Sequence, residues 1–198
     1  MRLTPTLPVL QSSPIFPSYG NPTPAYDPAY FLFLDAQYDD EKKRGISTGF
    51  LGFDLATQTA TFYDDGTTPS HMSNLSTVGH AITSALKNLP DQTTNKYIFI
   101  SDFMPTQRDI LAALEKATAG GVKWRITSRR SVAETKKEGE DKLGRGDWSG
   151  LGDMIVAAQY VGDVPEADYA KSHGLWNERL GLPVLDLQTE IEKLVRKG

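Results

Sequence analysis

The spacing of apolar residues predicts amphipathic helices in the second part of this chain. One helix starts at Ser76 as its cap and stops at Pro90. Its apolar residues recur at i, i+3, i+4, i+7, i+8 and i+11, namely Val78, Ala81, Ile82, Ala85, Leu86 and Leu89. A second helix opens with the capping-box pair Thr106 and Asp109 and ends at Gly120-Gly121. Its buried stripe is Ile110, Ala113, Leu114 and Ala117.

Three more helices follow. A charged helix over 131–145 carries an i,i+4 pair between Glu138 and Lys142. A short helix covers Met154–Tyr160. The last amphipathic helix is marked by Leu187, Ile191, Leu194 and Val195.

Strands are predicted where the helical spacing of apolar residues gives way to alternating or continuous apolar runs. The aromatic-rich runs FLGFDL and TATFYDD are joined around residues 56–59, which is hairpin length. Tyr97–Ile100 is a continuous apolar run typical of a strand covered on both faces. VKWRIT alternates, with Val122, Trp124 and Ile126 on one face. A strand, a helix and a strand over some thirty residues predict a parallel βαβ unit, so the fold class is α/β.

The start of the chain has a different character. Seven of its twelve prolines fall within residues 1–28, where they fix φ and remove amide donors. We expect a disordered or polyproline-like arm over 1–28 and one α/β domain over 29–198.

Composition narrows the function classes. A formal charge of -4 gives no reason to expect a nucleic acid partner. Without cysteine, disulfides, thiolate metal sites and cysteine catalysis are excluded. Prolines interrupt any N-terminal signal peptide, and no segment approaches about 20 apolar residues. The prediction is a cytoplasmic protein with no membrane partner.

Candidate chemistry is sparse. His71, His80 and His173 have no carboxylate or second histidine at ligand spacing, so no metal site is expected. His80 lies on the polar side of its helix, where a solvated histidine is expected. Tyr38 and Lys42 match the Tyr-x-x-x-Lys spacing of short-chain reductases, but no nucleotide-binding strand and helix precede them. The spacing alone therefore does not make them catalytic.

Two further clusters have a structural and a functional interpretation. GRGDWSGLGD follows a charged helix and not a strand, so it predicts a structural turn and not a dinucleotide loop. Lys123, Arg125, Arg129 and Arg130 either hold a phosphate or form a solvated strand edge, and the edge is the default interpretation.

One position has better physical support as a binding site. Ligands of open α/β sheets bind beyond the carboxyl ends of parallel strands. After the predicted strand at Ile100, this place is Ser101-Asp102-Phe103-Met104. Its side chains either line a cleft for an apolar ring or cap a loop.

Taken together, these segments resemble the later portion of NmrA-like proteins, especially the fungal members related to isoflavone reductases. The resemblance covers roughly residues 30–196. It is carried by GFLGFDL, YDDG, LST opening a helix, YIFIS, TQRDILAALEK, KWRIT, GDWSGLGD and LGLP.

The resemblance implies a partial NAD(P)-binding Rossmann-like domain, containing the later strands and the substrate-side subdomain. It also implies NADP as cofactor and a small, aromatic or phenolic substrate. The family's Gly-x-x-Gly-x-x-Gly loop, the basic residue after it and the proton-relay lysine have no counterpart here. Catalytic residues are therefore unknown and no cofactor-binding residue is assigned. The substrate-binding candidates are Phe31, Phe33, Phe50, Met104 and Trp148.

The leading functional hypothesis is the substrate-binding portion of an NADP-dependent reductase, inactive alone because the dinucleotide-binding half is missing. Apolar faces that would pack on that half would favour self-association or a protein partner. The alternative is a non-catalytic regulatory or interaction protein that binds a partner through an exposed sheet edge. In a third hypothesis, another polypeptide supplies the cofactor domain.

Overall fold

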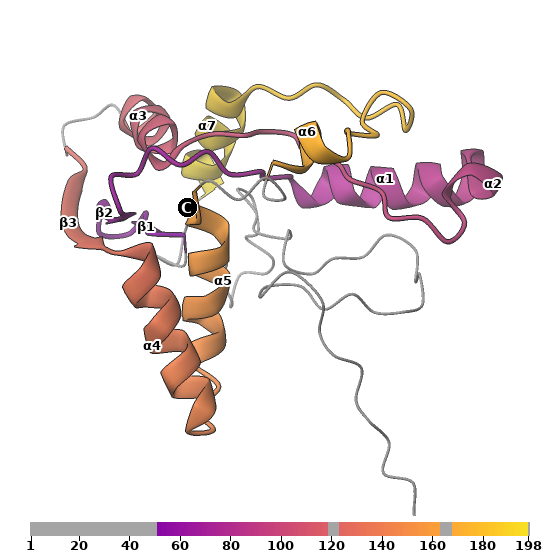
Figure 1. Cartoon of the computed structure of the whole chain (residues 1–198). Coiled ribbons are helices and arrows are strands. Elements are labelled where there is room, and N and C mark those ends of the chain that lie inside the picture. The colour runs from indigo at the N-terminus through magenta and orange to yellow at the C-terminus, as the bar shows by residue number, and fades with distance from the viewer. Residues whose placement is uncertain (1–50, 119–122, 163–167, 198) are drawn as a thin grey trace, which may run out of the picture.

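The computed structural model describes residues 51–118, 123–162 and 168–197 (Figure 1). The predicted proline-rich arm, Tyr38, Lys42 and Gly120-Gly121 lie outside these ranges, as does the boundary between the two predicted domains. The elements are β1 (Phe53–Asp54), β2 (Thr59–Tyr63), α1 (Leu75–Asn88), α2 (Pro90–Thr93), α3 (Gln107–Ala117), β3 (Arg125–Arg130), α4 (Val132–Gly144), α5 (Gly150–Tyr160), α6 (Tyr169–Ser172) and α7 (Leu187–Lys197). The α/β class is confirmed.

The three strands form one small mixed sheet in the order β1-β2-β3. β1 and β2 are the predicted antiparallel hairpin, with Phe53 opposite Ala60. Asp54 shapes the turn, because its Oδ1 accepts hydrogen bonds from the backbone N–H groups of Ala56 and Thr57. β2 and β3 run parallel, and α1, α2 and α3 all lie in the connection between them.

The predicted βαβ unit is wrong in its first strand. Tyr97–Ile100 has no strand assignment, and β2 takes the place beside β3. The segment is extended, but its backbone is bonded to loops: Trp176 N donates to Phe99 O, and Asn177 contacts the next residue, Ser101. An apolar run in the sequence indicates that a segment is buried. A strand also needs a neighbouring strand to share backbone hydrogen bonds with, and the spacing of apolar residues cannot identify that neighbour.

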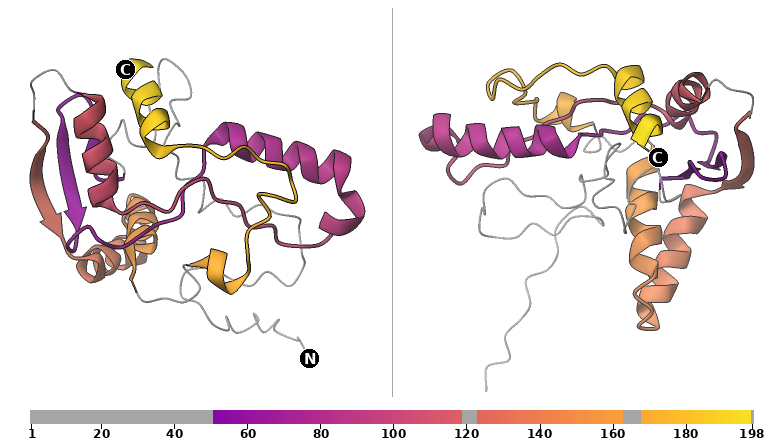
Figure 2. Two further views of the ribbon diagram at one scale, coloured as in Figure 1. Left: turned by 90° about the horizontal axis from the view of Figure 1, so that it is seen from above. Right: turned by 180° about the vertical axis from the view of Figure 1, so that it is seen from behind.

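Helices cover both faces of the sheet (Figures 1 and 2). Phe62 lies in a cluster with residues of α3 and α7, including Ile110, Leu114 and Ile191. The neighbouring Tyr63 points to the other face and stacks on Tyr160 of α5, with ring centroids 5.2 Å apart. The alternation along β2 therefore supplies two small cores, and the buried stripes predicted for α3 and α7 are confirmed at these residues.

The helix α1 extends away from the sheet and differs from its prediction at both ends. It begins at Leu75 with Asn74 in the cap position, and Pro90 opens α2, where proline's missing N–H costs nothing. Ala81 and Ala85 pack on Leu180 and Leu182, but Leu86 of the predicted stripe is 68% exposed. Among the described helices, none is long and apolar enough to cross a membrane.

A buried glutamine joins the sheet to its helices. Gln107 is fully buried at the start of α3, inside the predicted Thr106–Asp109 capping box, which is confirmed. Its Oε1 accepts from Tyr63 N at 2.8 Å, and its Nε2 donates to Thr61 O at 3.1 Å and Leu51 O at 3.4 Å. The one amide thus satisfies backbone groups of two neighbouring chain segments.

α4 and α5 form a tight helical hairpin. A Cβ on Gly150 would lie 2.5 Å from Gly139 O, so the helices approach this closely only because both residues are glycine. The predicted pair of Glu138 with Lys142 is wrong. Glu138 contacts Arg130 at the end of β3, and Lys142 lies 2.6 Å from Asp153 of α5. Both carboxylates therefore join separate elements instead of supporting one helix.

The Gln107 contacts predict a large effect of a nearly isosteric change. We expect Gln107→Leu to lower the free energy of unfolding by about 3 kcal/mol, because Tyr63 N–H and Thr61 C=O lose their buried partner. Urea unfolding at pH 7 measures this. The exposed Gln92→Leu is the control and should change stability by less than about 0.5 kcal/mol. Equal effects would contradict the bonding role of Gln107.

The glycine contact predicts opposite signs for one substitution at two helical positions. Gly150→Ala should destabilise the protein by about 1–3 kcal/mol, because the new methyl group meets Gly139 O. Gly79→Ala should stabilise it by about 1 kcal/mol, because Gly79 is exposed in α1 with nothing within 4 Å. Thermal unfolding of both variants tests the pair. A stabilising Gly150→Ala would mean that the hairpin is looser than described.

Candidate functional site

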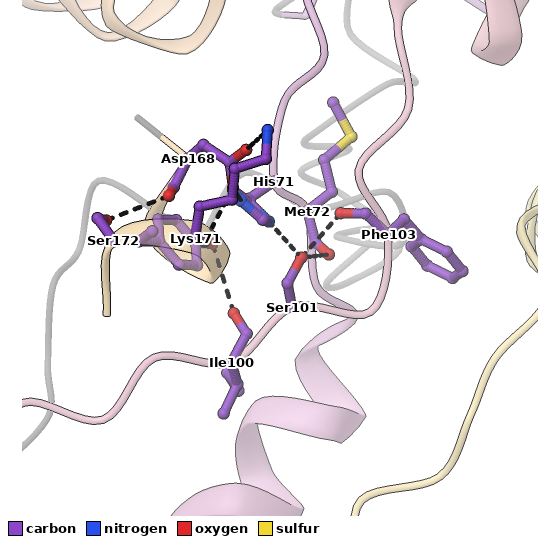
Figure 3. A network of polar contacts seen from close by, with 9 residues as sticks. His71, Met72, Ile100, Ser101, Phe103, Asp168, Lys171 and Ser172 are labelled. Atoms are coloured by element: carbon purple, nitrogen blue, oxygen red, sulfur yellow. Dashed lines mark hydrogen bonds and ion pairs between the residues drawn. The ribbon is translucent and has the colours of Figure 1, made fainter. Parts of the chain in front are cut away.

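Two extended segments, one before α1 and one before α3, pair beside the sheet and gather polar side chains. Met72 and Phe103 form an antiparallel bridge: Met72 N donates to Phe103 O at 2.9 Å, and Phe103 N donates to Met72 O at 3.0 Å. Figure 3 shows the side chains that meet here, from these two segments and from α6. This is the densest polar cluster near the predicted site at residues 101–104.

His71 lies at the centre of the cluster. Its Nδ1 is 2.9 Å from Ser101 Oγ, and its Nε2 is 3.5 Å from Asp168 Oδ1 (Figure 3). The imidazole stacks on the Tyr169 ring with centroids 3.9 Å apart. His71 and Ser101 are buried, and Asp168 lies at the start of α6. A serine, a histidine and a carboxylate from three distant segments therefore contact one another.

The hydrogen-bond partners of His71 indicate which ring nitrogen carries the hydrogen when the imidazole is neutral. The Asp168 carboxylate can only accept, so the hydrogen belongs on the Nε2 of His71, and Nδ1 then accepts from the Ser101 hydroxyl. A protonated imidazole would donate from both nitrogens. The hydroxyl would then donate to Phe103 O, 2.8 Å away. The network can thus accommodate a proton on His71 by rotating one hydroxyl.

The surroundings favour a neutral His71 beside a charged Asp168. Burial lowers the pKa of His71 from its usual value, and Asp168 partly offsets this by hydrogen bonding and charge. The pKa of Asp168 is lowered chiefly by the hydrogen bond from Lys171, whose Nζ lies 2.6 Å away. A neutral base therefore sits next to a paired acid, and the cluster carries little net charge.

The cluster positions the chain at the predicted binding segment. Ser101 is further held by Asn177, whose Nδ2 donates to Ser101 O at 2.8 Å and whose Oδ1 accepts from Ser101 N at 3.2 Å. Asp102 Oδ2 accepts from Asn74 N at 2.8 Å, before α1. The Asn177 amide and the Asp102 carboxylate therefore bond to the backbone, and together they hold the turn leading to Met104.

The sequence-predicted substrate residues fall in different places. Met104 is 38% exposed, directly after this turn, whereas Trp148 is 78% exposed in the connection between α4 and α5. That connection lies at the end of the hairpin far from the sheet (Figures 1 and 2). Phe31, Phe33 and Phe50 lie outside the described residues. The five residues remain a prediction, of which Met104 borders the polar cluster.

Sequence reasoning missed His71 and Asp168 as partners. They are far apart in the chain, and no spacing rule connects a histidine with a carboxylate across five helices and a strand. The structure alone separates the two histidines: His71 lies among buried residues of the segment before α1, whereas His80 is exposed in α1 as predicted.

A dinucleotide does not fit the described strand ends. Its pyrophosphate needs free amides at a helix N-terminus that follows a strand, and the described part offers this at the step from β3 to α4. There, Asp64 Oδ1 already accepts from Val132 N, and Ser131 Oγ accepts from Glu134 N. The predicted turn at 144–152 joins two helices. Within the described ranges, no three His, Cys, Asp or Glu side chains gather to hold a metal ion either.

Comparison with known proteins gives a functional direction. The chain is similar to oxidoreductase aprR of Aspergillus flavus, at 31% identity over 151 residues, which cover 74% of this chain and 48% of the relative. It is also similar to oxidoreductase poxI of Penicillium oxalicum, at 30% identity over 113 residues, which cover 56% of this chain and 34% of the relative. No family model matches the sequence. The relatives support an oxidoreductase family, and the chain spans half or less of their length.

The buried His71 predicts a specific loss of stability in mild acid. Its pKa in the folded protein is lowered, so the unfolded chain binds the proton more readily, and stability falls as the pH drops below about 6.5. We expect His71→Gln to flatten the dependence of the unfolding free energy on pH between about 6.5 and 5. Urea unfolding across this range measures it. The matched His80→Gln should keep the wild-type slope, and identical slopes in both variants would refute the assignment.

Proposed function

We propose that this chain forms the substrate-side part of an NADP-dependent reductase acting on small aromatic substrates. The observation that carries the proposal is the similarity, over 151 residues, to a protein named as an oxidoreductase. The α/β architecture with a small mixed sheet is compatible with part of a Rossmann-like domain. NADP is specified through the sequence resemblance to NmrA-like and isoflavone reductase-like proteins. A cytoplasmic location belongs to the same proposal.

The described residues support the substrate side of this reaction and not the cofactor side. The helix N-terminus that follows β3 is occupied by Asp64 and Ser131. A hydride donor would therefore have to be held by residues outside the described ranges or by another polypeptide. In this proposal the chain binds substrate by itself and does not turn it over.

Met104 is the proposed substrate contact among the described residues. Its flexible thioether is exposed next to the buried Phe103, and the two hydrogen bonds between the Asn177 amide and the Ser101 backbone hold the preceding turn. A methionine on a rigid turn can adapt to an aromatic ring without loss of position. The phenylalanines at 31, 33 and 50 complete the proposed pocket as sequence-based candidates.

The second candidate is a non-catalytic interaction protein. The specific observation in its favour is that β3 forms an edge of the sheet with nearly all of its residues exposed. Association through apolar faces is also part of this candidate, because Ile82 and Leu86 of α1 are exposed.

Ligand-induced stabilisation tests the reductase proposal. We expect millimolar 4-hydroxyacetophenone, as a small phenolic probe, to raise the melting temperature of the full chain, whereas NADPH at the same concentration does not. Met104→Ala should weaken binding of the probe about fivefold, because it removes apolar contact area. Val184→Ala, at another exposed apolar residue, is the control and should leave binding unchanged.

Three results would contradict the proposal. Absence of any stabilisation by the phenolic probe would refute the substrate-binding role. Equal binding to wild type and Met104→Ala would remove Met104 from the contact. Micromolar NADPH binding would show that the cofactor side lies within this chain.

A further inference from the structure

The sheet has one long open edge. β3 ends the strand order β1-β2-β3, and no strand of the described part lies beyond it. Figures 1 and 2 show β3 at the rim of the molecule. Residues 125–129 are exposed, and Arg130 is half-buried. Alternate residues of a paired strand direct N–H and C=O away from the neighbour, so β3 presents free backbone donors and acceptors on its outer side.

This edge carries unbalanced positive charge. Among the described residues, Lys123, Arg125 and Arg129 form no ion pair, whereas Arg130 is bound to Glu138 and Asp153. The Arg129 guanidinium is held over the Phe62 ring, 5.4 Å from its centroid, and so projects from a fixed place. A chain of net charge -4 thus concentrates three free cations along a stretch of seven residues.

The charges decide what kind of strand the edge can accept. Two copies of β3 paired edge to edge would bring arginines against arginines, and like charges on adjacent strands repel. The pairing of β3 with β2 has a register shift, so Arg125 lies on the face of Thr59 and Arg129 on the face of Phe62. The same cations therefore attract an extended peptide that carries carboxylates on both of its faces. Ile126, on the same face as Arg129, offers an apolar contact. The edge therefore rejects a second copy of itself and favours an acidic partner.

We propose that β3 binds an acidic peptide in an extended conformation, which adds to the sheet as a fourth strand. Backbone hydrogen bonds supply the geometry, and Lys123, Arg125 and Arg129 supply the preference for negative charge. This inference rests on the same edge as the second candidate function and names its partner class. It is independent of the proposed reductase role, because it uses none of the residues around His71 or Met104.

A fluorescently labelled octapeptide of the sequence Glu-Glu-Val-Val repeated twice, which has carboxylates on both faces of an extended chain, is titrated into the full chain at low salt and followed by anisotropy. We expect saturable binding that weakens about tenfold in Arg125→Glu/Arg129→Glu, since two exposed attractions become repulsions. The control Lys96→Glu/Lys137→Glu makes the same change in net charge at exposed positions on other elements. It should bind within about twofold of wild type.

Two further probes separate strand addition from general attraction of anions. An N-methylated peptide of the same sequence keeps the carboxylates but cannot donate backbone hydrogen bonds, and it should bind about tenfold more weakly. Binding that survives N-methylation, or fails to appear at millimolar peptide, would overturn the proposal. So would tighter binding of a single-stranded oligonucleotide of the same charge, because it would assign the edge to nucleic acid. Equal losses of peptide affinity in the two double variants would also overturn the proposal, because they would show a nonspecific effect of net charge.

Discussion

The amide of Gln107 is the constraint on which the arrangement of the sheet and its helices depends. It bonds the backbone of β2 at Thr61 and Tyr63 and the segment before β1 at Leu51. Leu51 O also accepts from the Tyr160 hydroxyl of α5 at 2.9 Å. The close approach needs a glycine at position 52, where φ is +87° and a Cβ would lie 2.3 Å from Thr61 O. One side chain thus fixes the hairpin, α3 and the position of α5 together.

The extended segments around Met72 and Phe103 have their backbone groups hydrogen-bonded without being part of the regular sheet. Their backbone groups find partners in side chains, chiefly the Asn177 amide, Asp102 and Ser101. Asp102 bonds from one segment to the other, and Asn177 reaches the Ser101 backbone from a distant part of the chain, so these segments are held from more than one direction. A rigid turn beside an exposed methionine is the result, and it is the geometry that a small-molecule contact requires.

Local signals predicted the parts of the fold that depend on neighbouring residues. The capping box at Thr106 and the stripe of α3 were confirmed, because both need only residues within one or two helical turns. Tyr97–Ile100 was misassigned because being a strand depends on a partner far away in the sequence. The same reason explains the wrong pairing of Glu138, which contacts β3.

The sequence places the candidate site at 101–104 because this segment follows a predicted strand, and that ground is wrong because Tyr97–Ile100 is not a strand. The segment remains a predicted binding position, and the structure brings His71 to it. Nothing in the sequence links His71 to Asp168, because α6 brings the carboxylate there through tertiary packing. The sequence also gives no sign that Asp64 bonds the first amide of α4, because an adjacent pair such as Asp64-Asp65 is typical of an ordinary turn.

The hydrogen bond from Val132 N to Asp64 Oδ1 places a carboxylate of the chain itself at the N-terminus of α4, where a bound anion would otherwise lie. Because this carboxylate is tethered to the end of β2, it is always present, whatever solutes surround the protein. The joint between the sheet and the α4–α5 hairpin is therefore set in the absence of any ligand. The position of Trp148 relative to the sheet is therefore set by contacts within the chain itself, through a bond that needs no bound molecule to form.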